Sequence, residues 1–185
     1  MVKIAPPARR SSSLQTATGL EISIPPKRNP FLMIFLAAWL VGWGFGEVTA
    51  GREILLGKET TPTLFLAVWL TMWTLGGAFA LYALLKMIGG RDVLLLRAST
   101  LLLKGEVFGL GRGREYELEH VRNLRVEGVT AWPNDMAGAM RFWGIGGGPI
   151  TFDYGSATVR WGAGLEEPEA RQVIQELRAR YPFQP

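Results

Sequence analysis

The 185-residue sequence contains no cysteine and only one histidine, His120. Without cysteine the chain has no disulfide framework and no thiolate metal site. A lone histidine also excludes Cys/His nucleophile pairs and multi-histidine metal centres. The phosphate-loop pattern G-x-x-x-x-G-K-[ST] is missing too, because GIGGGP (144–149) lacks the lysine. We therefore expect a non-enzyme with no catalytic residue, no metal and no cofactor.

Charged residues are missing from two long stretches, residues 29–46 and 60–85. As helices, these 18 and 26 residues would be about 27 and 39 Å long, and a hydrocarbon core of about 30 Å needs about 20 apolar residues. Two buried helices of a soluble core are the alternative, but neither stretch has a polar face. No small-residue cleavage site follows the first stretch, so it is not a signal peptide. We predict transmembrane helices at 30–48 and 62–88, with a loop at 49–61.

Basic residues flank the two stretches unevenly. The chain up to Pro30 has five basic residues and one acid, whereas the stretch from Glu47 to Glu59 has only Arg52 and Lys58 beside three glutamates. By the positive-inside rule both termini face the cytoplasm, in the inner (cytoplasmic) membrane. This charge is too local to indicate nucleic acid, but it suits an anionic lipid surface. The basic residues expected at that surface are Lys27, Arg28, Lys86 and Arg91.

The pattern A-x-W-L-x-x-W occurs in both predicted spans, at 37–43 and 67–73. Tryptophans four residues apart share a helix face. Counting about 1.5 Å of helix rise per residue from Pro30 and from Pro62 places Trp39 and Trp73 at similar depth in the membrane, and likewise Trp43 and Trp69. These tryptophans either cover the edges of the hairpin or face another membrane protein. Their indole N–H groups, which need partners in lipid, favour the second. The helix–helix seam that we expect from small residues consists of Ala38, Gly42, Gly46, Gly76 and Ala80.

The sequence outside the spans predicts short strands and one helix. We expect a disordered tail at 1–19, a juxtamembrane strand and basic anchor at 20–29, and a cytoplasmic β domain at 89–185. Expected strands of that domain are 92–97, 101–108, 114–119, 124–129, 149–155 and 157–162, with 109–113 as a hairpin loop. An amphipathic helix at 166–181 should cap the sheet, because its apolar residues recur on one face.

The segment 130–149 does not follow the strand pattern. Its large apolar residues are Trp132, Met136, Met140, Phe142 and Trp143. Either the segment folds under the sheet, or it exposes an aromatic and methionine surface to a partner or to the membrane interface, where such residues are enriched. The sequence leaves both open.

The order of strand, membrane hairpin, antiparallel strands and C-terminal helix resembles the bacterial pleckstrin-homology-like (bPH) membrane proteins. The residues that carry the resemblance are LEISIPPKRN (20–29), STLLLKGEVFGLGRGREYELEHVRNLRVE (99–127) and ITFDYGSATVRWGAGLEEPEARQVIQEL (150–177). The resemblance implies a membrane α + β fold, with a two-helix hairpin and a small antiparallel β-barrel or sandwich closed by a helix. It also implies an interaction or scaffold role. Lipid-headgroup recognition as in eukaryotic pleckstrin domains is not expected, because the loop 109–114 offers only Arg112 and Arg114.

Two functions follow. The first is an accessory or assembly subunit of a larger membrane complex, photosynthetic or respiratory, whose partners are other integral membrane proteins. Such a subunit would be free of pigment, because the charge-free stretches contain none of the usual axial ligands. The alternative is a free-standing scaffold or sensor that binds lipid or a cytoplasmic protein through its β domain.

Overall fold

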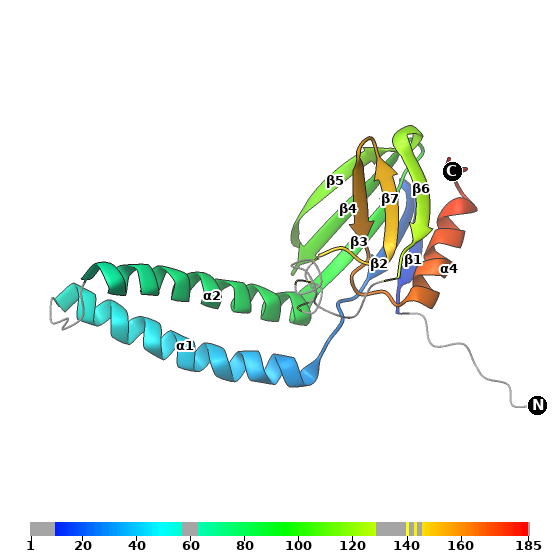
Figure 1. The fold of residues 1–185 in the computed structure, drawn as a ribbon. Coiled ribbons are helices and arrows are strands. Elements are labelled where there is room, and N and C mark those ends of the chain that lie inside the picture. Colours follow the sequence, from blue (N-terminus) through cyan, green and yellow to red (C-terminus); the bar gives the residue numbers. More distant parts are fainter. Residues whose placement is uncertain (1–9, 57–62, 129–139, 141–142, 144–145, 185) are drawn as a thin grey trace, which may run out of the picture. The chain divides into compact units, whose positions relative to one another are not determined.

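The protein is described here from a computed structural model (Figure 1). The model describes residues 10–56, 63–128, 140, 143 and 146–184. The chain divides into two compact units. One unit is residues 28–88, and the other combines residues 1–27 with 89–185. The unit 28–88, which contains the two long helices, is thus inserted into a domain whose strands come from both sides of it in the sequence.

Two long helices make up the inserted unit, α1 (Pro30–Leu56) and α2 (Thr63–Gly89). Asn29 begins α1, because its side-chain oxygen accepts a hydrogen bond from the backbone N–H of Leu32 at 3.2 Å. The expected end of this helix at residue 48 is wrong. Residues 49–56 contain no proline, the next one being Pro62, and the helix continues through them because nothing in their sequence stops it.

The larger sheet has five antiparallel strands in chain order: β1 (Ser12–Thr16), β2 (Gly19–Ile24), β3 (Gly90–Leu96), β4 (Thr100–Val107) and β5 (Leu110–Glu117). The strand expected at 20–24 is confirmed, and its alternating Leu20, Ile22 and Ile24 are buried. β2 pairs with β3, so that Ile22 lies opposite Leu94. The helical hairpin therefore connects two neighbouring strands of one sheet.

Strand β1 lies inside the stretch 1–19, for which we expected disorder, and that expectation is wrong for residues 12–16. Its side chains are exposed or half-buried, so the sequence shows no apolar alternation. The strand forms because its backbone pairs with β2 from Ser12↔Ser23 to Thr16↔Gly19. The start of β2 needs glycine, since Gly19 has a φ of 142° and a Cβ there would overlap the carbonyl of Leu96 on β3.

The β4–β5 turn is shorter than the expected loop at 109–113. Val107 pairs with Leu110, which leaves Phe108 and Gly109 as the two central residues of the turn. Both have positive φ, 51° and 82°, as a type I′ hairpin requires. Residues 110–113 consequently belong to β5 and not to a loop.

A second, three-stranded sheet has the order β6 (Val121–Val126), β7 (Ile150–Tyr154) and β8 (Ala157–Trp161). The short helix η1 (Leu118–His120) leads into it from β5. Over the described residues the two sheets do not join into a closed barrel. Of the two expected forms, barrel or sandwich, the barrel is therefore not formed.

Helix α4 (Glu167–Arg178) confirms the expected C-terminal helix (Figure 1). Glu166 and Glu169 form a reciprocal capping box at its start. Arg178 fixes its other end by donating a 2.7 Å hydrogen bond to the carbonyl oxygen of Leu124 on β6. The apolar face of α4, including Val173 and Leu177, is buried in one core together with residues of both sheets.

Candidate functional site

The two long helices expose apolar side chains around most of their circumference. Only 11% of the most apolar 18-residue window of each helix is buried. Phe31, Phe45 and Leu64 are 80%, 78% and 78% exposed. Both helices are long and apolar enough to span a membrane. A helix that is apolar all round requires apolar surroundings.

Four tryptophans, Trp39, Trp43, Trp69 and Trp73, form what we call the tryptophan cluster of the hairpin. The rings of Trp69 and Trp73 stack on α2 at a centroid distance of 4.9 Å. Trp39 of α1 lies 6.2 Å from the ring of Trp73. Trp43 donates a 3.1 Å hydrogen bond from Nε1 to the backbone carbonyl of Trp73. The cluster therefore joins the two helices, and the indole of Trp43 finds its partner within the hairpin.

The register between the helices differs from the expected one. Trp39 and Trp73 meet as predicted, but Trp43 lies against Gly77, where a Cβ would overlap its indole ring, and not against Trp69. The reason is the length of α1: because it continues to Leu56, the facing residues of α2 shift toward its C-terminus. This shift brings Gly77, which was not among the predicted seam residues, into the seam.

The predicted small-residue seam is only partly formed. Gly46 packs against the ring of Trp73, because a Cβ built on Gly46 would lie 3.7 Å from the nearest ring atom. Ala80 is buried. Ala38 is exposed, and Gly42 and Gly76 have no atom within 4 Å of an ideal Cβ. Those three residues therefore do not lie in the seam, because Trp43 and Trp73 occupy the space between the helices.

One acidic residue lies inside α1 beside the tryptophan cluster. Glu47 Oε1 accepts a 2.6 Å hydrogen bond from the hydroxyl of Thr74 on α2. The other Glu47 carboxylate oxygen and the Trp73 indole N–H are buried with no hydrogen-bond partner in the described part of the chain. The sequence shows Glu47 only as the residue that bounds the charge-free stretch, one position before the predicted end of the helix at residue 48. Its position within α1 makes it the polar centre of the helical pair.

The other end of the hairpin is closed by Arg28. Its guanidinium donates a 3.2 Å hydrogen bond to the carbonyl oxygen of Ile88, in the last turn of α2, where a cation is favourable. Lys27, also predicted for the lipid surface, is exposed, and Lys86 is half-buried. Arg91 pairs with Glu106 on the neighbouring strand. Of the four predicted surface residues, Arg28 and Arg91 therefore also have structural partners.

The predicted contact segment 130–149 falls largely outside the described residues. Trp132, Met136 and Phe142 lie outside them. Met140 and Trp143 are described and are half-buried. Both alternatives for residues 130–149, a segment folded under the sheet or a surface exposed to a partner, therefore stay predictions.

An ion-pair cluster on the larger sheet centres on Glu106, which sequence reasoning missed. Its side chain is 7% exposed and pairs with Lys104 at 2.5 Å and Arg91 at 2.6 Å. The hydrogen bond from Lys104, followed by that from Arg91, holds the pKa of the Glu106 carboxyl below its ordinary value. The sequence signal was the K-x-E spacing on β4, which places Lys104 and Glu106 on one face of the strand.

The lowered pKa of Glu106 predicts a pH-dependent contribution to stability. Because the folded-state pKa lies below the unfolded one, the contribution is present above pH 4.5, the ordinary value, and is lost as the pH falls through the folded pKa. We expect Glu106→Gln to lower the unfolding free energy by about 1–2 kcal/mol at pH 7. Thermal unfolding of the full chain in mild detergent measures the difference.

This difference should shrink on acidification below pH 4.5. Glu115→Gln is the control, since Glu115 and its partner Arg97 are both 40% or more exposed and such pairs contribute little. If Glu106→Gln lowers the unfolding free energy as much below pH 4.5 as it does at pH 7, the lowered pKa of Glu106 is not the source of this stability.

A second charged cluster lies on the smaller sheet, around Asp153. Its carboxylate accepts hydrogen bonds from Asn123, Thr158 and Arg125, each at 3.0 Å. The bond from Asn123 is the main cause that lowers the pKa of Asp153, and Thr158 and Arg125 add to it. Hydrogen bonding to Glu127 raises the pKa of Arg125. Asn123 lies at the irregular register of β6 and has a φ of 50°. The hydrogen bonds from Asn123 and Arg125 to Asp153 therefore hold the irregular part of β6 against β7.

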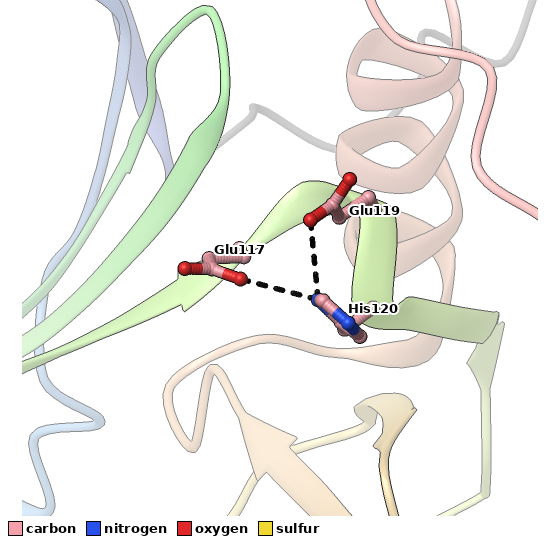
Figure 2. Close-up of side chains that lie close together, drawn as sticks. All are labelled: Glu117, Glu119 and His120. Atoms are coloured by element: carbon pink, nitrogen blue, oxygen red, sulfur yellow. Dashed lines mark ion pairs between the residues drawn. The ribbon is translucent and has the colours of Figure 1, made fainter.

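His120 lies beside two carboxylates at the end of β5. Its Nδ1 is 3.2 Å from a Glu117 oxygen and 3.7 Å from a Glu119 oxygen (Figure 2). The three side chains could reach one small cation, since their ligand atoms lie within 4.8 Å of one another. All three are more than half exposed. This arrangement is ordinary for a charged strand end in water, and we assign it no metal.

No protein-family model, no curated protein and no solved structure matches this chain. We therefore infer the function from the geometry of the hairpin and of the sheet domain.

Proposed function

We propose that the chain is a non-catalytic integral membrane protein whose α1–α2 hairpin anchors the sheet domain, and that it serves as an accessory or assembly subunit of a larger membrane complex. The observation that carries the proposal is the exposure of apolar side chains around both long helices, with 11% of each window buried. Soluble monomers rarely expose contiguous apolar surface of this kind to water. A bilayer supplies the missing apolar surroundings.

The tryptophan cluster supports a protein partner in that bilayer. Trp39 and Trp69 remain 36% and 38% exposed after the hairpin is formed, and tryptophan is enriched in binding hot spots. Glu47 points in the same direction, because ionisable residues within membrane helices are rare and functional by default. The excess of lysine and arginine at the Arg28 and Lys86 ends supports an orientation with both termini in the cytoplasm.

The first test is the membrane association of the full chain. We expect it to stay with the membrane pellet after alkaline carbonate extraction and to float with vesicles after reconstitution, because two spans resist both treatments. Gentle solubilisation of native membranes, followed by mass spectrometry, should recover the chain with other integral membrane proteins. A chain that stays soluble without detergent, or that emerges alone from cross-linked native membranes, would contradict the proposal.

The partner surface is tested by replacing Trp39 and Trp69 together with leucine. A buried interfacial tryptophan contributes about 2 kcal/mol or more, so the partner recovered with the variant should fall tenfold or more. Phe45→Leu with Leu75→Val is the matched control, because each residue lies two positions beyond a cluster tryptophan and hence on the opposite helix face. If both variants retain the partner equally, the tryptophan surface is not the contact.

A further inference from the structure

The turn between β4 and β5 ends in an exposed apolar tip. Phe108 is 61% exposed and Leu110 is 81% exposed. Val107 and Leu110 are the last paired residues, so Phe108 lies within the turn and Leu110 directly follows it. In a soluble hairpin this position is normally polar, since asparagine or aspartate with glycine forms the preferred type I′ turn.

Phe108 is also held in an unfavourable backbone conformation. Its φ of 51° lies in the left-handed region, where asparagine or glycine is favoured over a bulky side chain. Phenylalanine here lowers the stability of the turn and exposes a ring to solvent at the same time. Neither property helps the fold, and a strained, exposed position of this kind indicates a function.

The tip is fixed beside the end of helix α2. The backbone N–H of Phe108 donates a 3.0 Å hydrogen bond to the carbonyl oxygen of Gly89, and the Phe108 ring lies against Gly89. Gly89 is the last residue of α2, three residues after Lys86, at which the charge-free stretch ends. Three helical residues rise about 4.5 Å, which is within the headgroup layer of roughly 5–7 Å on each side of the hydrocarbon core.

Positive charge follows the tip along β5. Arg112 and Arg114 are exposed on one face of the strand, with glycines between and before them. Arg91 and Arg97 have carboxylate partners in the sheet, whereas Arg112 and Arg114 have no ion-pair partner among the described residues. Arg112 lies two residues beyond Leu110, about 7 Å along the strand. An apolar tip followed by unpaired cations complements the acyl chains and anionic headgroups of a bilayer surface.

We infer that the β4–β5 tip inserts Phe108 and Leu110 into the lipid interface next to the end of α2, with Arg112 against anionic headgroups. The inference rests on the proposed membrane-spanning hairpin and adds a second point of attachment to it. The two attachments together would fix the sheet domain against the cytoplasmic leaflet. The tip was not among the predicted lipid contacts, which were Lys27, Arg28, Lys86 and Arg91.

The absence of cysteine makes the test direct, because one introduced cysteine takes a single label. Leu110→Cys carries an NBD fluorophore at the tip. Ser99→Cys, in the β3–β4 turn just before Thr100, carries it at the other end of β4, about 23 Å away. The full chain is reconstituted into vesicles of phosphatidylcholine and phosphatidylglycerol that contain a lipid with a nitroxide near the headgroup. We expect the label at 110 to be quenched several-fold more than the label at 99.

A companion variant separates lipid contact from folding. Phe108→Asn supplies the residue that the turn prefers, so its thermal midpoint should equal or exceed that of the parent, while quenching at 110 falls toward the value at 99. Arg112→Gln should reduce quenching at 110 in the phosphatidylglycerol vesicles but not in vesicles of phosphatidylcholine alone.

The possible outcomes distinguish the inference from the proposed function. If the chain floats with the vesicles but the labels at 110 and 99 are quenched equally, the inserted tip is wrong and the spanning hairpin stands. If the label at 110 is shielded in native membranes but not in pure lipid, a protein covers the tip and the lipid assignment is overturned. If the chain does not float, both the inference and the proposed function fail.

Discussion

Gly77→Leu should separate helices α1 and α2, whereas Gly76→Leu, one residue earlier, should leave them packed. A Cβ at Gly77 would overlap the indole of Trp43, and Gly77 is buried. At Gly76 an ideal Cβ meets no atom within 4 Å. Forcing extra volume into a packed interface costs about 1–3 kcal/mol, and in lipid no hydrophobic gain between the helices offsets it. Thermal unfolding in mild detergent should show a lower midpoint for Gly77→Leu alone.

The circular dichroism of the indoles provides a local readout for the same pair of variants. The stacked rings of Trp69 and Trp73 should give an exciton signal that weakens when Trp43 is pushed out of the seam. Adding Trp43→Ala to Gly77→Leu should restore part of the lost stability, because it removes the side chain that the leucine displaces. Equal midpoints for the Gly76 and Gly77 variants would show that the seam does not lie where the structure places it.

Phe152→Ala should destabilise the sheet domain by about 3–5 kcal/mol, the usual cost of removing a large core aromatic. Phe152 on β7 is 1% exposed, and its ring makes an edge contact with Tyr116 on β5 at a centroid distance of 5.3 Å. That contact links the three-stranded sheet to the five-stranded one. Denaturant unfolding of the full chain in detergent, followed by hydrogen exchange of β5 and β7, measures both the global and the local loss.

Phe108→Ala is the matched control for Phe152→Ala, since it removes the same ring from an exposed position. Its effect on stability should stay within about 0.5 kcal/mol. A similar loss for both variants would mean that the two sheets do not share the core described here.

The two long apolar helices and the terminal helix could be predicted because their signals are local. Residues 29–46 and 60–85 lack charge, and such a run requires apolar surroundings whatever the rest of the chain does. Residues 166–181 combine an apolar face with acids at the start and arginines at the end, which is sufficient to specify an amphipathic helix. Alternation of apolar residues likewise revealed β2 at 20–24.

Features that depend on pairing between distant residues could not be predicted in the same way. β1 has no apolar face, and only the free edge of β2 gives its backbone a partner. The buried carboxylate of Glu106 forms an ion pair with Arg91, a residue on another strand. The separation of the strands into two sheets depends on which strands pair, which their individual sequences do not specify.

The sequence by itself determined that this chain has two long apolar helices, a β domain and a terminal helix. These elements follow from composition and from the spacing of apolar residues, which are properties of short stretches of chain. The tertiary structure alone decided which faces meet. It brought Trp43 onto Gly77, because α1 runs on to Leu56. It also placed Phe108 against Gly89, because the pairing of β3 with β4 returns the β4–β5 turn to the point where α2 ends.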